Sequence, residues 1–284
     1  MAISNFPQIL FEDDDLVVLD KSAGWVVNSA DSTQAPAIQD WFSEKYPAAP
    51  DKNWESLVPQ DFSAEFGTPA EIFKTRRGMV HRLDKDTSGV LLLAKNPGSL
   101  VNLLAQFRLR QVQKKYVCLV HGGFKLNQGE IVAPLGRSRK DRQKFAVDIS
   151  GRPAVTLYSV LEFFTHLRGV TNAAETAVPL VGKEILTPLR KERTVYLQGF
   201  SLVECTPKTG RTHQIRVHLA HIHHPLVGDI TYCGSKRAKL DPLWCPRQFL
   251  HATELKFKHP RTNEELVIQS PLPTDLKKVL EWVI

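Results

Sequence analysis

Residues 81–95 read HRLDKDTSGVLLLAK, and the rest of the chain is organised around them. The polar part, His81 to Gly89, packs two carboxylates, three basic or potentially basic side chains and two hydroxyls into one short segment. The apolar run that follows is short and lies between Gly89 and Asn96-Pro97, which predicts a buried strand. The polar residues therefore lie on a loop attached to a rigid strand, where catalytic groups are often found.

The two aspartates of this loop, Asp84 and Asp86, decide which chemistry it can perform. A carboxylate can attack a sugar carbon as a nucleophile, or it can remove a proton as a base. Arg82 can contact a phosphate or pair with a carboxylate. The alternative is a polar turn in which Asp86 and Ser88 bind the neighbouring backbone. These physical features by themselves leave both interpretations open.

The exact string resembles the signature of the RluA-type pseudouridine synthases, which is His-Arg-Leu-Asp, two residues, Thr-Ser-Gly and an apolar run ending in Ala-Lys. The segment CTPKTGRTHQIRVH, residues 205–218, resembles a further motif of the same family. The resemblance covers most of the chain, from about Ile9 to His259. It implies an α+β fold with a mixed, largely antiparallel sheet, flanking helices and a central active-site cleft. It also implies that the protein isomerises specific uridines in RNA to pseudouridine, without a cofactor or a metal.

The resemblance implies roles for individual residues as well. Asp84 takes the place of the essential catalytic aspartate and acts on the ribose, either by attacking C1′ or by removing the C2′ proton. Arg82 helps to hold the target nucleotide or fills the space left by the flipped base, and Tyr116 stacks on the uracil. Arg216 forms a salt bridge with Asp84 and keeps that carboxylate ionised. The candidate substrate-binding residues are Arg82, Tyr116, Arg216, His81, Thr87 and Arg211.

The charge balance favours a polyanionic partner. The formal net charge is +7 and the pI is about 9.2, which points first to nucleic acid. Cations crowd residues 137–144, with Asp141 as the single acid among them. They would repel one another unless they are solvated or face phosphates, so we expect this loop to contact the RNA backbone. The cations are Arg137, Arg139, Lys140, Arg142 and Lys144.

The hydrophobic pattern predicts the remaining elements. Residues 9–11 and 16–19 form a hairpin, and strands cover about 116–120, 156–163 and 253–257. Helices cover about 37–46 and 97–110, one begins near Thr212, and a closing helix has Thr274 as its N-cap. We expect residues 1–284 to form a single catalytic domain, without an N-terminal S4 domain because the hairpin starts near residue 9. Two insertions, at about 47–75 and 165–193, depart from the family pattern, and the first is predicted to be a long loop.

Other features exclude several classes of protein. The N-terminus has no signal-peptide pattern, no apolar run is long enough to span a membrane, and the four cysteines are far apart. We therefore expect a cytoplasmic monomer with no membrane partner. The spacing of histidines and cysteines fits no zinc site. The main alternative is a non-catalytic RNA-binding protein that keeps the fold, followed by a metal-dependent hydrolase that a chelator would inactivate. Ribosomal and transfer RNA both stay open as substrates, with a slight preference for ribosomal RNA.

Overall fold

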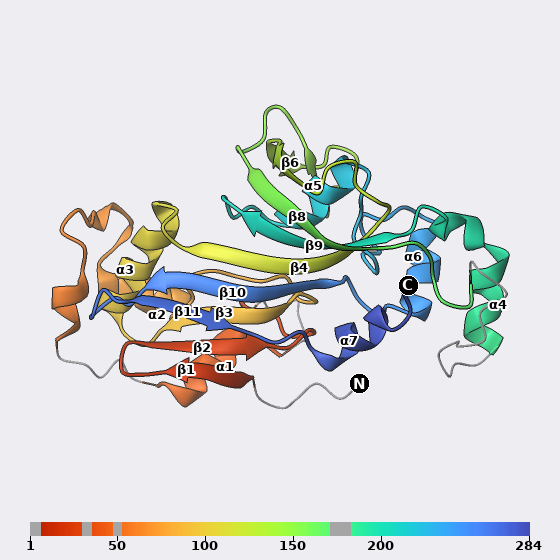
Figure 1. Cartoon of the computed structure of the whole chain (residues 1–284). Coiled ribbons are helices and arrows are strands. Elements are labelled where there is room, and N and C mark those ends of the chain that lie inside the picture. Colours follow the sequence, from red (N-terminus) through yellow and green to blue (C-terminus); the bar gives the residue numbers. More distant parts are fainter. Residues whose placement is uncertain (1–6, 30–35, 48–52, 171–182) are drawn as a thin grey trace. The chain divides into compact units, whose positions relative to one another are not determined.

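The computed structural model describes residues 7–29, 36–47, 53–170 and 183–284, which fall into two compact units (Figure 1). The first unit comprises Met1–Lys114 and Ala252–Pro271, and the second comprises Lys115–His251 and Leu272–Ile284.

Antiparallel strands organise the first unit. β1 (Gln8–Glu12) pairs with β2 (Leu16–Lys21), and β2 pairs with β3 (Ser88–Ala94). β10 (Leu250–Lys258) follows β3 in the sheet and also pairs with β11 (Glu265–Gln269). Every residue of β3 is buried, as its unbroken apolar run predicts for a strand covered on both faces. The predicted hairpin and the predicted buried strand are both confirmed.

Helix α3 (Pro97–Arg108) covers this sheet. It begins after Asn96, whose side chain accepts the backbone N–H of Ser99, and Pro97 occupies the first helical position. Its Leu100 and Leu103 pack into a cluster with residues of the strands, so the helix buries its apolar face on them. Helix α1 (Ile38–Lys45) matches the helix predicted at 37–46.

The predicted long loop at 47–75 is wrong over its described part. It contains the 3-10 helices Trp54–Leu57 and Ala64–Phe66 and then helix α2 (Pro69–Arg76). Thr68 and Glu71 form a reciprocal capping box, and a proline opens the helix. The sequence Thr-Pro-Ala-Glu carried this signal, although the helix shows little apolar periodicity. Residues 48–52 lie outside the described residues.

The second unit is built on four antiparallel strands in the order β4 (Gln113–His121), β9 (Phe200–Pro207), β8 (Val155–Phe164) and β5 (Gln128–Val132). β8 confirms the strand predicted at 156–163, and the second insertion lies between β8 and its antiparallel partner β9. That insertion contains helix α4 (Lys183–Lys191), and the 3-10 helix Arg193–Tyr196 follows it. Residues 171–182 lie outside the described residues.

Shorter elements complete the second unit. β6 (Leu135–Arg137) and β7 (Phe145–Val147) form a small hairpin, and helix α5 (Gln214–His221) follows the second sequence motif. Helix α6 (Arg237–Leu240) leads into the 3-10 helix Asp241–Leu243. Helix α7 (Thr274–Leu280) closes the chain. Its N-cap is Pro273 and Thr274 is its first helical residue, so the predicted cap was wrong by one position.

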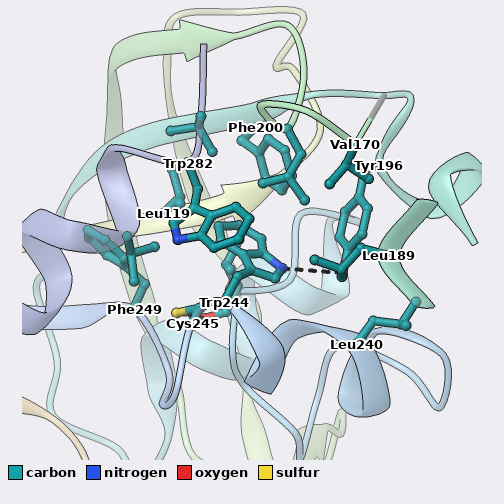
Figure 2. Close-up of a cluster of buried hydrophobic side chains, with 14 of the residues drawn as sticks. Leu119, Val170, Leu189, Tyr196, Phe200, Leu240, Trp244, Cys245, Phe249 and Trp282 are labelled. Atoms are coloured by element: carbon teal, nitrogen blue, oxygen red, sulfur yellow. Dashed lines mark hydrogen bonds between the residues drawn. The ribbon is translucent and has the colours of Figure 1, made fainter. Parts of the chain in front are cut away.

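Aromatic side chains fill the core of the second unit. Figure 2 shows Phe200, Tyr196 and Trp244 among the buried residues of one cluster. The Trp244 ring centroid lies 5.4 Å from that of Phe200. The Trp244 Nε1–H donates to the Tyr196 hydroxyl at 3.3 Å, and that hydroxyl donates to Asp241 at 3.1 Å. The polar atoms of these large side chains are thus hydrogen bonded inside an apolar core.

The predicted α+β class with a largely antiparallel sheet is confirmed by these pairings. The central cleft stays a prediction. Within the part of the chain described above, no helix combines the length and apolar character that crossing a membrane requires.

Replacing Phe200 by alanine tests the aromatic core. Phe200 is fully buried, so Phe200→Ala is expected to lower the free energy of unfolding by about 3–5 kcal/mol, from lost apolar transfer and the cavity left behind. Leu197→Ala is the control, because Leu197 is 64% exposed and its loss should cost less than about 0.5 kcal/mol. Denaturant unfolding measures both, and equal effects would contradict this account of the core.

Candidate active site

The loop that carries Asp84 is tied to the end of β2 by a buried lysine. The Lys21 ammonium donates to the carbonyl of Lys85 at 2.9 Å and to that of Thr87 at 2.8 Å. The Lys21 side chain is completely buried. The backbone N–H of Gly24 also donates to the Lys85 carbonyl. A buried charge is costly unless it is hydrogen bonded, so the loop carbonyls and the lysine hold each other in place.

Gly89 lets the strand begin directly after this loop. Its φ is +114°, and a Cβ atom there would lie 2.1 Å from the carbonyl oxygen of Ala252 in β10. Only glycine fits both the conformation and the contact. Within the loop, the N–H of Thr87 donates to the Asp84 carbonyl at 3.1 Å and closes a turn. The Asp84 side chain is half-buried, Thr87 is buried and Arg82 is exposed.

His81 anchors the other end of the loop. Its ring stacks on Phe107 at 5.0 Å, and its Nε2 accepts the N–H of Leu92 at 3.0 Å. Burial is the main cause that lowers the pKa of His81 to about 3, and the positive charge of Lys114 contributes to the same shift. Burial also lowers the pKa of Lys114, to about 8. His81 is therefore neutral with its proton on Nδ1, and its predicted contact with substrate stays a prediction.

In the second unit, Gln214 fixes the turn that precedes α5. Its Oε1 accepts the hydroxyl of Thr209 at 2.7 Å and the N–H of Arg211 at 3.0 Å. Its Nε2 donates to the carbonyl of Val155 at 2.9 Å. The Arg211 side chain donates to the carbonyl of Pro153 at 3.2 Å. The threonine, arginine and glutamine of this motif thus attach the start of the helix to the start of β8.

Arg216 lies on α5 and makes a bidentate ion pair with Asp229. The two distances are 2.7 Å from Nε to Oδ2 and 2.9 Å from Nη2 to Oδ1, and both side chains are more than 90% buried. Tyr232 places its ring 5.1 Å from the guanidinium carbon. A bidentate pair fixes the plane of a guanidinium as well as its position. The sequence reasoning missed Asp229, because nothing local distinguishes it, and the pairing of Arg216 with Asp84 stays a prediction.

Tyr116 lies on β4, opposite Cys205 of β9. It is half-buried and packs against a buried apolar cluster of the second unit. Its predicted stacking on uracil stays a prediction.

The predicted cationic loop is the connection of the β6–β7 hairpin. The loop is closed by the N–H of Ser138, which donates to the carbonyl of Lys144, and by the Arg137 side chain, which donates to the carbonyl of Arg142. Two carboxylates lie close to the cations, Asp148 at 3.5 Å from Arg139 and Asp141 at 3.5 Å from Lys144. Five cations lie near only these two carboxylates, so the hairpin keeps an excess of positive charge. The exposed cations are Arg137, Arg139, Lys140 and Arg142, and Lys144 is half-buried.

One group among the described residues has the composition of a metal site, namely Asp13, Asp15 and His259 of the first unit. Arg261 donates to both oxygens of Asp15, at 2.7 and 2.8 Å, and His259 Nε2 lies 2.8 Å from Asp13. The ligand atoms thus take part in an ion pair and a hydrogen bond, and a cation there would have to displace the arginine. We assign no metal to this group.

Comparison with known proteins identifies the family. Residues 15–221 match the RNA pseudouridylate synthase family, and the chain belongs to it. An uncharacterized RNA pseudouridine synthase of Bacillus subtilis is 35% identical over 273 residues, covering 96% of this chain and 71% of that protein. A ribosomal large subunit pseudouridine synthase D of Nitrosomonas europaea is 34% identical over 283 residues, covering 97% of this chain and 65% of that protein. The structure of human RNA pseudouridylate synthase domain containing 1 has a TM-score of 0.63 at 23% identity, covers 96% and 87% of the two chains, and supports the fold alone.

The chain is thus an enzyme of the RNA pseudouridine synthase class, an isomerase that acts on RNA. This confirms the family, the reaction class and the RNA partner that the two motifs implied. The individual site residues are taken up below as proposals.

Replacing Lys21 by methionine tests the anchor of the loop. Lys21→Met keeps the apolar stem but removes the ammonium that donates to the carbonyls of Lys85 and Thr87, so the free energy of unfolding is expected to fall by about 2–3 kcal/mol. Lys74→Met, on the exposed face of α2, is the control and should change it by less than about 0.5 kcal/mol. Denaturant unfolding compares the two, and a neutral Lys21→Met would refute the anchoring role.

The pH dependence of stability tests the state of His81. Its pKa is lower in the folded protein than the ordinary value of 6.5, so the unfolded chain binds more protons between pH 6.5 and about 3. The contribution of His81 is fully present above pH 6.5 and is lost as the pH falls toward 3. His81→Gln keeps an acceptor for Leu92 but does not titrate. At pH 4 this variant should lose less stability relative to pH 7 than the parent does, by more than about 1 kcal/mol. Parallel denaturant titrations with identical pH dependence would show that His81 is ionised in the folded state.

Proposed function

We propose that Asp84 is the catalytic carboxylate of this RNA pseudouridine synthase and that its substrate is large-subunit ribosomal RNA. The observation that carries the first part is the loop of Asp84, which lies within the matched family region and is fixed by Lys21 and Gly89. A fixed loop keeps a carboxylate in one place relative to a bound ribose, and such preorganisation is a large part of catalysis.

In the proposed reaction the bond from N1 of the target uracil to C1′ of its ribose is broken, the uracil turns, and C5 is joined to C1′. C5 then loses its proton and N1 takes one up, so the product is an isomer of the starting nucleotide. Asp84 acts on the ribose, as a nucleophile toward C1′ or as a base toward the C2′ proton. Arg216 is proposed to pair with Asp84. Tyr116 stacks on the uracil, and Arg82, which is exposed, holds the target nucleotide or fills the space it leaves.

The cations of the β6–β7 hairpin are proposed to bind the RNA backbone, and Arg211 at the start of α5 is proposed to bind a phosphate. The exposure of Arg137, Arg139, Lys140 and Arg142, and the excess of hairpin cations over nearby carboxylates, support the role of the hairpin. His81 and Thr87 are proposed to contribute to substrate binding by fixing the shape of the loop that carries Asp84. The choice of ribosomal RNA over transfer RNA rests on relatives that are named ribosomal large subunit pseudouridine synthases.

The two units are proposed to act together as one catalytic domain. The matched residues 15–221 include parts of both units, and the proposed partners Asp84 and Arg216 come from different units. We further propose a monomer that works in the cytoplasm, since its four cysteines are all reduced and buried and need no oxidising compartment.

Mapping pseudouridine in cellular RNA tests the proposal. In cells that carry Asp84→Asn in place of the parent enzyme, one or more sites in large-subunit ribosomal RNA are expected to vanish. With purified protein, Asp84→Asn should lower the rate by at least about 10²-fold because a catalytic group is removed, while RNA affinity changes little.

Asp86→Asn is the matched control, since Asp86 lies in the same loop two residues away and should leave the sites present. If no site changes although the Asp84→Asn protein binds RNA, the assignment of Asp84 fails. If the lost sites lie in transfer RNA, the assignment of the substrate fails instead.

A further inference from the structure

Tyr232 connects the cationic hairpin to Arg216. Its hydroxyl accepts the backbone N–H of Phe145, the first residue of β7, at 3.0 Å. The same hydroxyl lies 2.8 Å from Nδ1 of His213, at the N-cap of α5. The ring lies 5.1 Å from the guanidinium carbon of Arg216, within the range of a cation–π contact. One side chain thus touches the hairpin, the start of α5 and the arginine.

The hairpin also packs on α5. Phe145, Val147 and Tyr232 are partly buried against a small cluster formed by Leu135, Ala154 and Val217. Figure 1 shows the hairpin next to α5. Because packed side chains resist small displacements, a shift of β7 must move Tyr232 or break its hydrogen bond.

Asp229 and Tyr232 belong to a single turn. The backbone N–H of Tyr232 donates to the carbonyl of Asp229 at 3.1 Å, and the N–H of Thr231 donates to the Asp229 side chain at 3.1 Å. The turn follows Gly228, whose N–H donates to the buried Asp241 at 3.1 Å. Gly228 has a φ of +73°, and a Cβ there would lie 2.1 Å from the carbonyl of Arg247. The two groups that hold Arg216 are therefore presented by one turn fixed to the core.

We propose that Asp229 and Tyr232 are positioning residues for Arg216, and that Tyr232 couples this arginine to RNA bound at the β6–β7 hairpin. The proposal rests on the proposed function, in which Arg216 pairs with Asp84 and the hairpin binds the RNA backbone. Asp229 sets the plane of the guanidinium, and the ring of Tyr232 helps to set its position.

The physical basis is the charge of the hairpin. In the absence of RNA its five cations repel one another, and only two carboxylates, Asp141 and Asp148, lie close enough to offset them. Phosphates bound there remove the repulsion and favour the closed hairpin, in which Phe145 donates to Tyr232. A displacement of about 1 Å in a positioning group can cost about 10²-fold in rate, so a small shift of Arg216 is sufficient.

A double-mutant cycle tests the coupling. One change is Tyr232→Phe, which keeps the ring over Arg216 and removes the hydroxyl. The other replaces Lys140 and Arg142 of the hairpin by glutamine. Three quantities are measured with large-subunit ribosomal RNA transcribed in vitro, which carries no modification: the single-turnover rate at saturating RNA, the Kd for RNA and the thermal unfolding midpoint.

The hairpin variant is expected to raise Kd about tenfold, through loss of two phosphate contacts, and to lower the saturating rate as well. Tyr232→Phe should lower the saturating rate about fivefold, as for a lost hydrogen bond, with Kd within twofold of the parent. The combined variant should be no slower at saturation than Tyr232→Phe alone. If the two rate effects multiply, or if the hairpin variant changes Kd only, the coupling is refuted.

Tyr196→Phe is the matched control, because it also removes a hydrogen-bonded hydroxyl of the second unit, in this case a buried one bonded to Asp241 and Trp244. It should lower the unfolding midpoint at least as much as Tyr232→Phe does and leave the saturating rate unchanged. An equal loss of rate in both variants would mean that Tyr232 acts only through stability, and the positioning role would fail.

Asp229→Asn tests the other positioning residue. It keeps the volume of the side chain and removes its charge, so the saturating rate should fall by about 10²-fold. If Asp229→Asn folds and keeps the parent rate, its positioning role is refuted; if it does not fold, the cycle on Tyr232 decides. A hairpin variant with unchanged Kd, or full activity of Asp84→Asn, would overturn the proposed function itself. If the hairpin variant raises Kd and Asp84→Asn is inactive, but the rate effects of Tyr232→Phe and of the hairpin variant multiply, only the coupling is overturned.

Discussion

The structure of the first unit depends on one buried cation. Lys21 ends β2 and places its ammonium among three carbonyl oxygens, that of Ser22 and those of Lys85 and Thr87 in the loop that carries Asp84. An ammonium without water requires such acceptors, and loop carbonyls without water require a donor, so each needs the other. The register of β2 with β3, which pairs Lys21 with Gly89, brings them together. The stable sheet thereby fixes the segment on which Asp84 lies, although that segment has no regular structure of its own.

The second unit manages its buried cation differently. Arg216 faces a carboxylate, and the pair is bidentate and nearly inaccessible to water. Removing either partner would leave an uncompensated buried charge, which costs far more than the net contribution of the pair. A flexible lysine suits several carbonyls around one point, whereas a planar guanidinium suits one carboxylate and keeps a defined orientation. A lysine at position 21 therefore suits the task of holding a loop in the first unit. An arginine at position 216 suits a site in the second unit where the side chain needs a fixed direction.

Local sequence patterns were sufficient to predict the helices and strands that bury a strongly apolar face. The apolar runs at residues 9–11 and 16–19 gave β1 and β2, and the continuous apolar run after Gly89 gave β3. The Asn96-Pro97 start and the 3.6-residue period gave α3. Helix α2 was missed because its evidence lies in a capping box and not in periodicity. The chemistry of the site came from two motifs, since an aspartate in a polar turn has no physical feature that marks it as catalytic. Asp229 and Tyr232 could not be found this way, because their roles arise only where the turn after Gly228 meets α5.

The residues of the signature divide into those that hold the loop and those that face outward. His81 is neutral, stacked on Phe107 and bonded to the backbone of β3, and Thr87 is buried beside the lysine. In the sequence between His81 and Thr87, Arg82 is exposed and Asp84 is half-buried. A loop whose flanking side chains are fixed loses little further conformational entropy when a substrate binds, so binding energy is left for the reacting ribose. The short length of the signature thus has a physical reason. The anchors His81 and Thr87 must be close in sequence to Asp84, because a longer flexible backbone between them would restore the conformational entropy that the anchors remove.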